Sequence, residues 1–100
     1  MGESVVSESA LPSFNLEGRI ALVTGAGRGI GRTLALGLAE AGADIVALSR
    51  SEEELESVTR EIRALGREAS PLVCDVTKTG GMQAAISNLP KLDILVNNAG

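Results

Sequence analysis

The stretch VTGAGRGIG (residues 23–31) decides the fold of this 100-residue chain. It overlaps the end of an apolar run, RIALVT (19–24), which lies between two glycines and is typical of a strand buried on both faces. Apolar residues after it recur at helical spacing and predict one buried helix face: Ile30, Leu34, Leu38 and Ala41. The helix is expected to stop at Gly42. The glycine-rich stretch is therefore predicted to carry the chain from a buried strand into a helix.

Three further apolar runs predict strands later in the chain. They cover residues 44–49, 69–75 and 92–97. Pro71 lies near the start of the second of these runs, and a proline cannot donate to a strand ladder. We therefore expect that strand at an edge of the sheet.

Helical patterns separate these strands. Ser51 and Glu54 have capping-box spacing, and the helix that they begin is predicted to bury Leu55, Val58, Ile62 and Leu65. The glutamates around Glu54 are interpreted as complementing the positive end of the helix dipole, not as a catalytic carboxylate pair. A third helix is predicted over about 79–89, before Pro90, with its apolar face formed by Met82, Ala85, Ile86 and Leu89.

The order β-α-β-α-β-α-β leaves no room for hairpins. It predicts an α/β fold, a Rossmann-like doubly wound parallel sheet that is truncated after its fourth strand. Residues 1–15 are predicted to be a flexible arm, and residues 16–100 a single domain.

Composition narrows the classes of function. A formal net charge of −4 argues against nucleic-acid binding. No apolar run approaches the roughly 18 residues that span a bilayer, and the first residues resemble neither a signal peptide nor a transit peptide. Cys74 is the only cysteine, so we expect no disulfides and a reducing, cytoplasmic location.

Glycines between a strand and a helix indicate an anion-binding site. Backbone N–H groups and the positive end of the helix dipole converge there, and an anion needs the chain to approach without Cβ atoms in the way. A pyrophosphate fits this description. The alternative is a tight turn in which the glycines only permit unusual backbone angles.

Three motifs resemble those of the short-chain dehydrogenase/reductase family. The first is the loop T-G-x-x-x-G-x-G formed by Thr24, Gly25, Gly29 and Gly31, a spacing that differs from the standard dinucleotide fingerprint and from the Walker pattern. The others are CDVT (74–77) and NNAG (97–100), in the order that the family shows. The resemblance covers residues 16–100.

This resemblance implies a set of cofactor-binding residues. Asp75 would accept from the adenine amino group, and Val76 would offer its backbone. Asn97 would support the sheet and contact the cofactor. The other implied residues are Gly25, Gly27, Arg28, Gly29, Ile30, Gly31 and Ala99. The alternatives are that Asp75 is a solvated carboxylate at a strand end and that Asn97 only ties down backbone groups.

The end of the second strand indicates which dinucleotide binds. An acidic residue there would hold the ribose hydroxyl of NAD, whereas a basic residue accommodates the 2′-phosphate of NADP. This chain has Ser49 and Arg50, and Arg28 in the glycine loop is a second guanidinium. NADP is therefore the expected cofactor and NAD the alternative, unless both arginines are only surface charges.

The resemblance also implies a reaction, a hydride transfer between nicotinamide and a carbonyl or alcohol substrate. The family moves the accompanying proton with a tyrosine, assisted by a lysine four residues later and by a serine. This chain contains no tyrosine. We expect it to be the cofactor-binding half of a longer oxidoreductase that forms homo-oligomers, with no catalytic residue and no metal site of its own. The alternative is a non-catalytic NAD(P)-binding module or truncated sensor.

Overall fold

The predicted alternation of strands and helices is confirmed. The computed structural model describes residues 15–75 and 80–98, apart from the Met82 side chain, so almost all of the predicted arm lies outside the described residues. The elements are β2 (Ile20–Thr24), α1 (Gly29–Glu40), β3 (Asp44–Ser49), α2 (Glu52–Ala64), β4 (Ala69–Val73), α3 (Gly81–Ser87) and β5 (Ile94–Val96). None of the helices described is long and apolar enough to cross a membrane.

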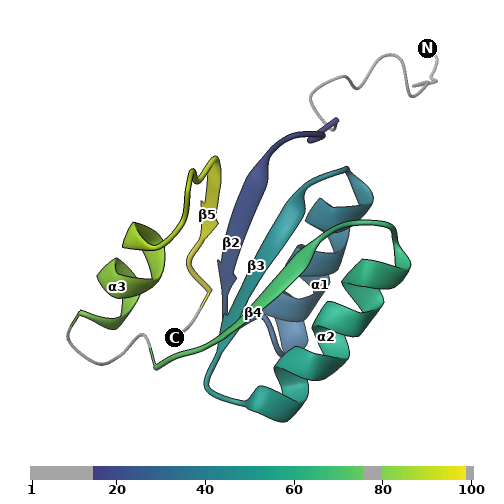
Figure 1. Ribbon diagram of the computed structural model, residues 1–100. Coiled ribbons are helices and arrows are strands. Elements are labelled where there is room, and N and C mark those ends of the chain that lie inside the picture. The colour runs from purple at the N-terminus through teal and green to yellow at the C-terminus, as the bar shows by residue number, and fades with distance from the viewer. Residues whose placement is uncertain (1–14, 76–79, 99–100) are drawn as a thin grey trace, which may run out of the picture.

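Within the described ranges, the strands form one parallel sheet in the order β4-β3-β2-β5. Helices α1 and α2 lie on one face of it and α3 on the other (Figure 1). This arrangement confirms the doubly wound, Rossmann-like sheet. Strand β4 lies at an edge, as Pro71 predicted.

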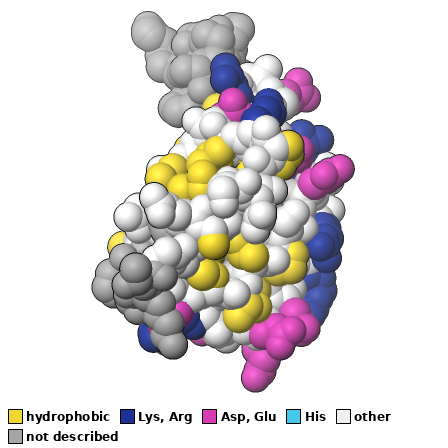
Figure 2. All heavy atoms as spheres, turned by 60° about the vertical axis from the view of Figure 1, so that its left-hand side comes forward, with side chains coloured by type: hydrophobic (Ala, Val, Ile, Leu, Met, Phe, Trp, Pro, Cys, Tyr) yellow, Lys and Arg dark blue, Asp and Glu magenta, His cyan; other side chains and the backbone are white. Residues whose placement is uncertain are grey.

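Burial follows the position of each strand in the sheet. The interior strands β2 and β3 are buried on both faces, which explains their continuous apolar runs. The edge strands expose part of their apolar surface, including Val73 of β4 and Leu95 of β5. Figure 2 shows hydrophobic side chains at the surface on one side of the molecule. The fourth predicted strand is thus an edge, paired with β2 through residues 94–96.

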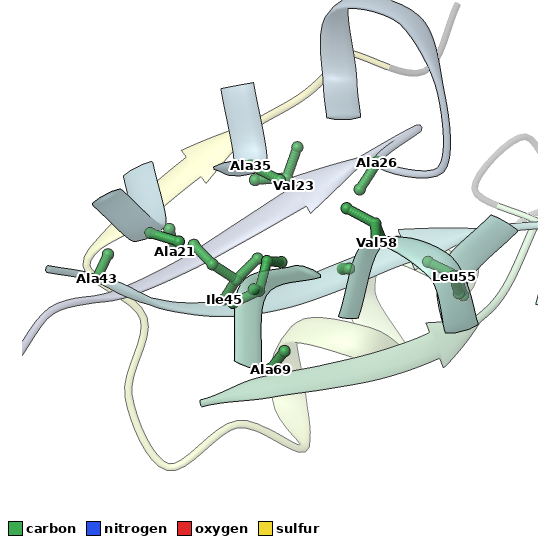
Figure 3. Close-up of a cluster of buried hydrophobic side chains, with 12 residues drawn as sticks. Ala21, Val23, Ala26, Ala35, Ala43, Ile45, Leu55, Val58 and Ala69 are labelled. Atoms are coloured by element: carbon green, nitrogen blue, oxygen red, sulfur yellow. The ribbon is translucent and has the colours of Figure 1, made fainter. Parts of the chain in front are cut away.

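The larger core lies between the sheet and helices α1 and α2 (Figure 3). Seven of its twelve buried residues are alanines, which let the helices approach the strands closely, and Ile45, Leu55, Val58 and Ile62 supply much of the volume. A smaller cluster on the opposite face packs Leu22 and Leu48 against Ala85 of α3. The sheet is therefore covered on both sides.

The predicted buried face of α1 is wrong at its first two residues. Ile30 is 70% exposed and Leu34 is 40% exposed, whereas Gly31, Ala35 and Ala39 face the core. Small side chains are needed on the inner face because the helix lies close to the strands, so Ile30 and Leu34 turn outward. Leu38, also predicted on this face, is partly buried and packs against the core.

The predicted buried face of α2 is correct except at its end. Leu55, Val58 and Ile62 are buried, but Leu65 is 44% exposed. The helix ends at Ala64, and Leu65 is the capping residue beyond it. The helical periodicity therefore no longer fixes the direction of the Leu65 side chain.

Asp93 fixes the start of β2 beside the start of β5. Its carboxylate accepts from the Ile20 N–H at 2.8 Å, and its own N–H donates to the Ile20 carbonyl. The Ile20 N–H lowers the pKa of Asp93, and although partial desolvation opposes this, Lys91 and Arg19 lower it further. The ionised carboxylate is thus the form that the fold stabilises.

We expect Leu55→Ala to lower the free energy of unfolding by about 2–5 kcal/mol, because it leaves a cavity in the larger core. Leu65→Ala removes the same atoms from the residue that caps the same helix but is expected to change the free energy by less than about 1 kcal/mol. Urea unfolding of both variants measures the difference. Equal losses would mean that Leu65 belongs to the core.

The lowered pKa of Asp93 predicts a pH dependence. Its contribution to stability is present above the pKa of an unfolded aspartate, about 4, and is lost as pH falls through the lower folded pKa. Asp93→Asn should therefore lower Tm at pH 7, and the gap to the wild type should shrink in more acidic buffer. A gap that stays constant between pH 7 and pH 3 would contradict this account.

Candidate cofactor-binding site

The candidate site lies where the parallel strands end. Because the strands are parallel, the residues that follow them meet along one edge of the sheet. The glycine loop follows β2, Ser49 and Arg50 lie at the end of β3, Asp75 follows β4, and Asn97 follows β5. The fold therefore brings these predicted residues to one edge.

Two glycines of the loop have positive φ angles, 62° at Gly25 and 60° at Gly29, which favour glycine. A Cβ at Gly29 would have nothing within 4 Å. A Cβ at Gly31 would lie 2.0 Å from the Gly25 carbonyl oxygen and 2.7 Å from Asn98 Nδ2. Gly29 thus leaves open space, whereas Gly31 allows the first turn of α1 to pack against the end of β2.

The N-terminus of α1 has the properties of an anion site. Its N-cap residue, Arg28, is extended and makes no capping hydrogen bond with its side chain, and the first turn contains no acidic residue. The first hydrogen bond of the helix runs from the Arg32 N–H to the Arg28 carbonyl, so helix geometry leaves the earlier N–H groups without an acceptor in the helix. This end can therefore hold a negatively charged group.

The N-terminus of α2 differs. Ser51 Oγ accepts from the Glu54 N–H at 3.3 Å, as the capping-box spacing predicted. The first turn contains Glu52 and Glu53 as well, so carboxylates already complement its dipole. Of these two neighbouring helix ends, only that of α1 is left for an external anion.

Thr24 joins the ends of β2 and β5. Its hydroxyl accepts from the Asn98 N–H at 2.8 Å and lies 3.2 Å from Asn97 Oδ1 and 3.4 Å from the Val96 carbonyl oxygen, to one of which it donates. The Asn97 side chain therefore lies beside the junction of the two strands. The sequence motif contained Thr24, but its role depends on β5 lying beside β2, which only the strand order reveals.

The two arginines of the candidate site each lie near a carboxylate. Arg50 is 4.0 Å from Asp75 and has a side chain 75% exposed. Arg28 is 3.9 Å from Glu54 and has a side chain 86% exposed. Both guanidinium groups can thus turn toward a ligand at this edge without breaking a buried contact.

For three of the predicted site residues, the structure shows little of how they could bind a cofactor. Val76 and Ala99 lie outside the described residues. Ile30 lies in the first turn of α1 with its side chain in solvent, so its backbone is the part that can face a ligand. Conversely, Glu54 was not predicted as a site residue, yet its side chain reaches the glycine loop.

Comparisons with known proteins agree with this geometry. A family model described as short chain dehydrogenase matches residues 19–100. A curated relative, 2-dehydro-3-deoxy-D-gluconate 5-dehydrogenase from Pseudoalteromonas atlantica, is 50% identical over 95 residues. The alignment covers 90% of this chain and 37% of that relative. The chain therefore spans little more than a third of the length of this relative.

Two solved structures of dinucleotide complexes are also similar. The RhlG/NADP active-site complex from Pseudomonas aeruginosa is 41% identical with a TM-score of 0.78, covering 89% of this chain and 37% of that one. Carveol dehydrogenase from Mycobacterium avium in complex with NAD is 29% identical with a TM-score of 0.74, covering 86% and 37%. Similar folds thus occur with either dinucleotide.

The two loop glycines should respond differently to the same substitution. Gly31→Ala places a methyl group against the Gly25 carbonyl and should lower the free energy of unfolding by about 3 kcal/mol or more, since backbone must move. Gly29→Ala meets no neighbour and should lower it by about 1–2 kcal/mol, the strain of a positive φ. Urea unfolding compares them. A larger loss for Gly29→Ala would contradict the close approach at Gly31.

Proposed function

The chain belongs to the short-chain dehydrogenase family, and we propose that it forms the NADP-binding part of an oxidoreductase. The observation that carries this proposal is the open N-terminus of α1, where positive-φ glycines precede first-turn N–H groups and the first turn of the helix itself has no acidic side chain. These features fit a dinucleotide pyrophosphate. When bound, the cofactor supplies or accepts a hydride at its nicotinamide ring.

The residues of this chain would hold the cofactor. The glycine loop, through Gly25, Gly27, Gly29, Ile30 and Gly31, would bind the pyrophosphate with its backbone. Asp75 and Val76 would bind the adenine, and Asn97 and Ala99 the part of the cofactor near β5. We assign no proton transfer to this chain, because it has no tyrosine.

The preference for NADP is proposed from the charges of the site. Ser49 and Arg50 offer a hydroxyl and a guanidinium group at the end of β3, and Arg28 in the glycine loop offers a second guanidinium. A guanidinium is suited to a phosphate. The similar structures contain NADP in one protein and NAD in another, so family membership leaves this choice to local residues.

The substrate proposed for the full-length protein is a small carbonyl or alcohol compound. This agrees with the names of its relatives, among them the sugar-acid dehydrogenase from Pseudoalteromonas atlantica. We further propose that the full-length protein is a cytoplasmic homo-oligomer; the single cysteine suits a reducing compartment.

Replacing Arg50 with Asp should reverse the cofactor preference. A charge-assisted hydrogen bond to the 2′-phosphate is worth roughly 1.5–3 kcal/mol, or about ten- to hundredfold in Kd. Arg50→Asp removes this attraction, repels the phosphate and offers an acceptor to the 2′-hydroxyl of NAD. Calorimetry of NADPH and NADH binding to the full-length protein at fixed ionic strength measures the effect.

Arg60→Asp is the control, because Arg60 is an exposed arginine of α2 and its substitution changes the net charge of the protein by the same amount as Arg50→Asp. It should leave the ratio of the two dissociation constants unchanged. If Arg50→Asp also leaves the ratio unchanged, or if the wild type prefers NADH, the assignment of Arg50 to the 2′-phosphate is wrong.

A further inference from the structure

Glu54 lies at the candidate site although its place in the sequence does not suggest it. It belongs to the first turn of α2, where its N–H donates to Ser51 Oγ. Its side chain is 35% exposed and extends toward the glycine loop that follows β2. The carboxylate is therefore brought to the loop by the fold, from 23 residues beyond the last loop glycine, Gly31.

The surroundings of Gly27 show where this carboxylate lies. Gly27 is buried, and the point where its Cβ would lie is 2.6 Å from Glu54 Oε1 and 3.3 Å from Ser49 Oγ. On the same side chain, Glu54 Oε2 is 3.9 Å from Arg28 Nε. Glu54 thus shares one small region with Ser49 and Arg28, two of the groups proposed to bind the 2′-phosphate.

A carboxylate in this region acts on the two dinucleotides in opposite ways. It repels the 2′-phosphate of NADP and neutralises part of the charge of Arg28, whereas it can accept a hydrogen bond from the 2′-hydroxyl of NAD. The partial exposure of Glu54 weakens both effects through solvent screening but does not reverse them. The net effect is to reduce discrimination between the cofactors.

We propose that Glu54 is a specificity-determining residue that limits the preference for NADP and allows the site to accept NAD. The proposal rests on the proposed function, since it concerns the same dinucleotide site. It assigns to Glu54 the role that an acidic residue at the end of the second strand has in NAD-specific sites. At that place this chain has Ser49 and Arg50 instead.

The test is Glu54→Gln in the full-length protein. Glutamine keeps the length of the side chain over Gly27, and the hydrogen bond to Ser51 uses only the Glu54 backbone N–H. We expect the ratio of the Kd for NAD to the Kd for NADP, measured by calorimetry at low and fixed ionic strength, to rise about three- to tenfold. Added salt should reduce this rise.

Glu53→Gln is the matched control, because Glu53 is an exposed neighbour in the same helical turn and loses the same charge. It should change the ratio much less than Glu54→Gln. Equal changes in the two variants would mean that only the general charge of the helix end matters, and would overturn the proposal.

The remaining outcomes separate this proposal from the proposed function. If Glu54→Gln leaves the ratio unchanged, Glu54 has no part in cofactor choice and the proposal is wrong. If it weakens NADP binding, Glu54 instead positions Arg28 and the proposal is wrong as well. If the wild type prefers NAD but Glu54→Gln still shifts the ratio toward NADP, the proposal stands and the NADP assignment fails. A wild type that binds neither dinucleotide overturns both.

Discussion

The close approach of α1 to the end of β2 is the constraint on which the rest of the site depends. At Gly31 a Cβ would lie only 2.0 Å from the Gly25 carbonyl oxygen, so the helix reaches this position only without a side chain. The approach places the first turn of α1 at the carboxyl edge of the sheet, beside the ends of β3 and β5. Further along α1, the small side chains of Ala35 and Ala39 on the inner face also keep the helix near the strands.

Much of the fold could be predicted from the sequence because its elements are short and strongly patterned. Buried strands, the Ser51 cap and the edge position of Pro71 follow from local chemistry. The inner face of α1 could not be predicted in this way. Ile30 and Leu34 are among the largest apolar side chains in the helical pattern, whereas close packing requires Ala35 and its small neighbours on the inner face. Hydrophobicity ranks residues by transfer free energy and does not include the distance between layers.

The candidate site was predictable only as far as it is local in sequence. The loop glycines, Arg28 and Arg50 belong to short motifs, so their positions could be expected from strand and helix order. Glu54 could not be identified as a site residue in this way, because its spacing equally fits a helix cap and only the contact with Gly27 shows where its carboxylate lies. A residue that acts across two elements has no fixed spacing from the motif that it influences.

The most direct measurement is a crystal structure of the full-length protein with NADP bound. We expect diphosphate oxygens to accept hydrogen bonds, at about 2.7–3.2 Å, from backbone N–H groups in the first turn of α1, residues 29–31. A dinucleotide bound with its diphosphate away from this turn would contradict the account, even if the adenine still lay near the end of β4.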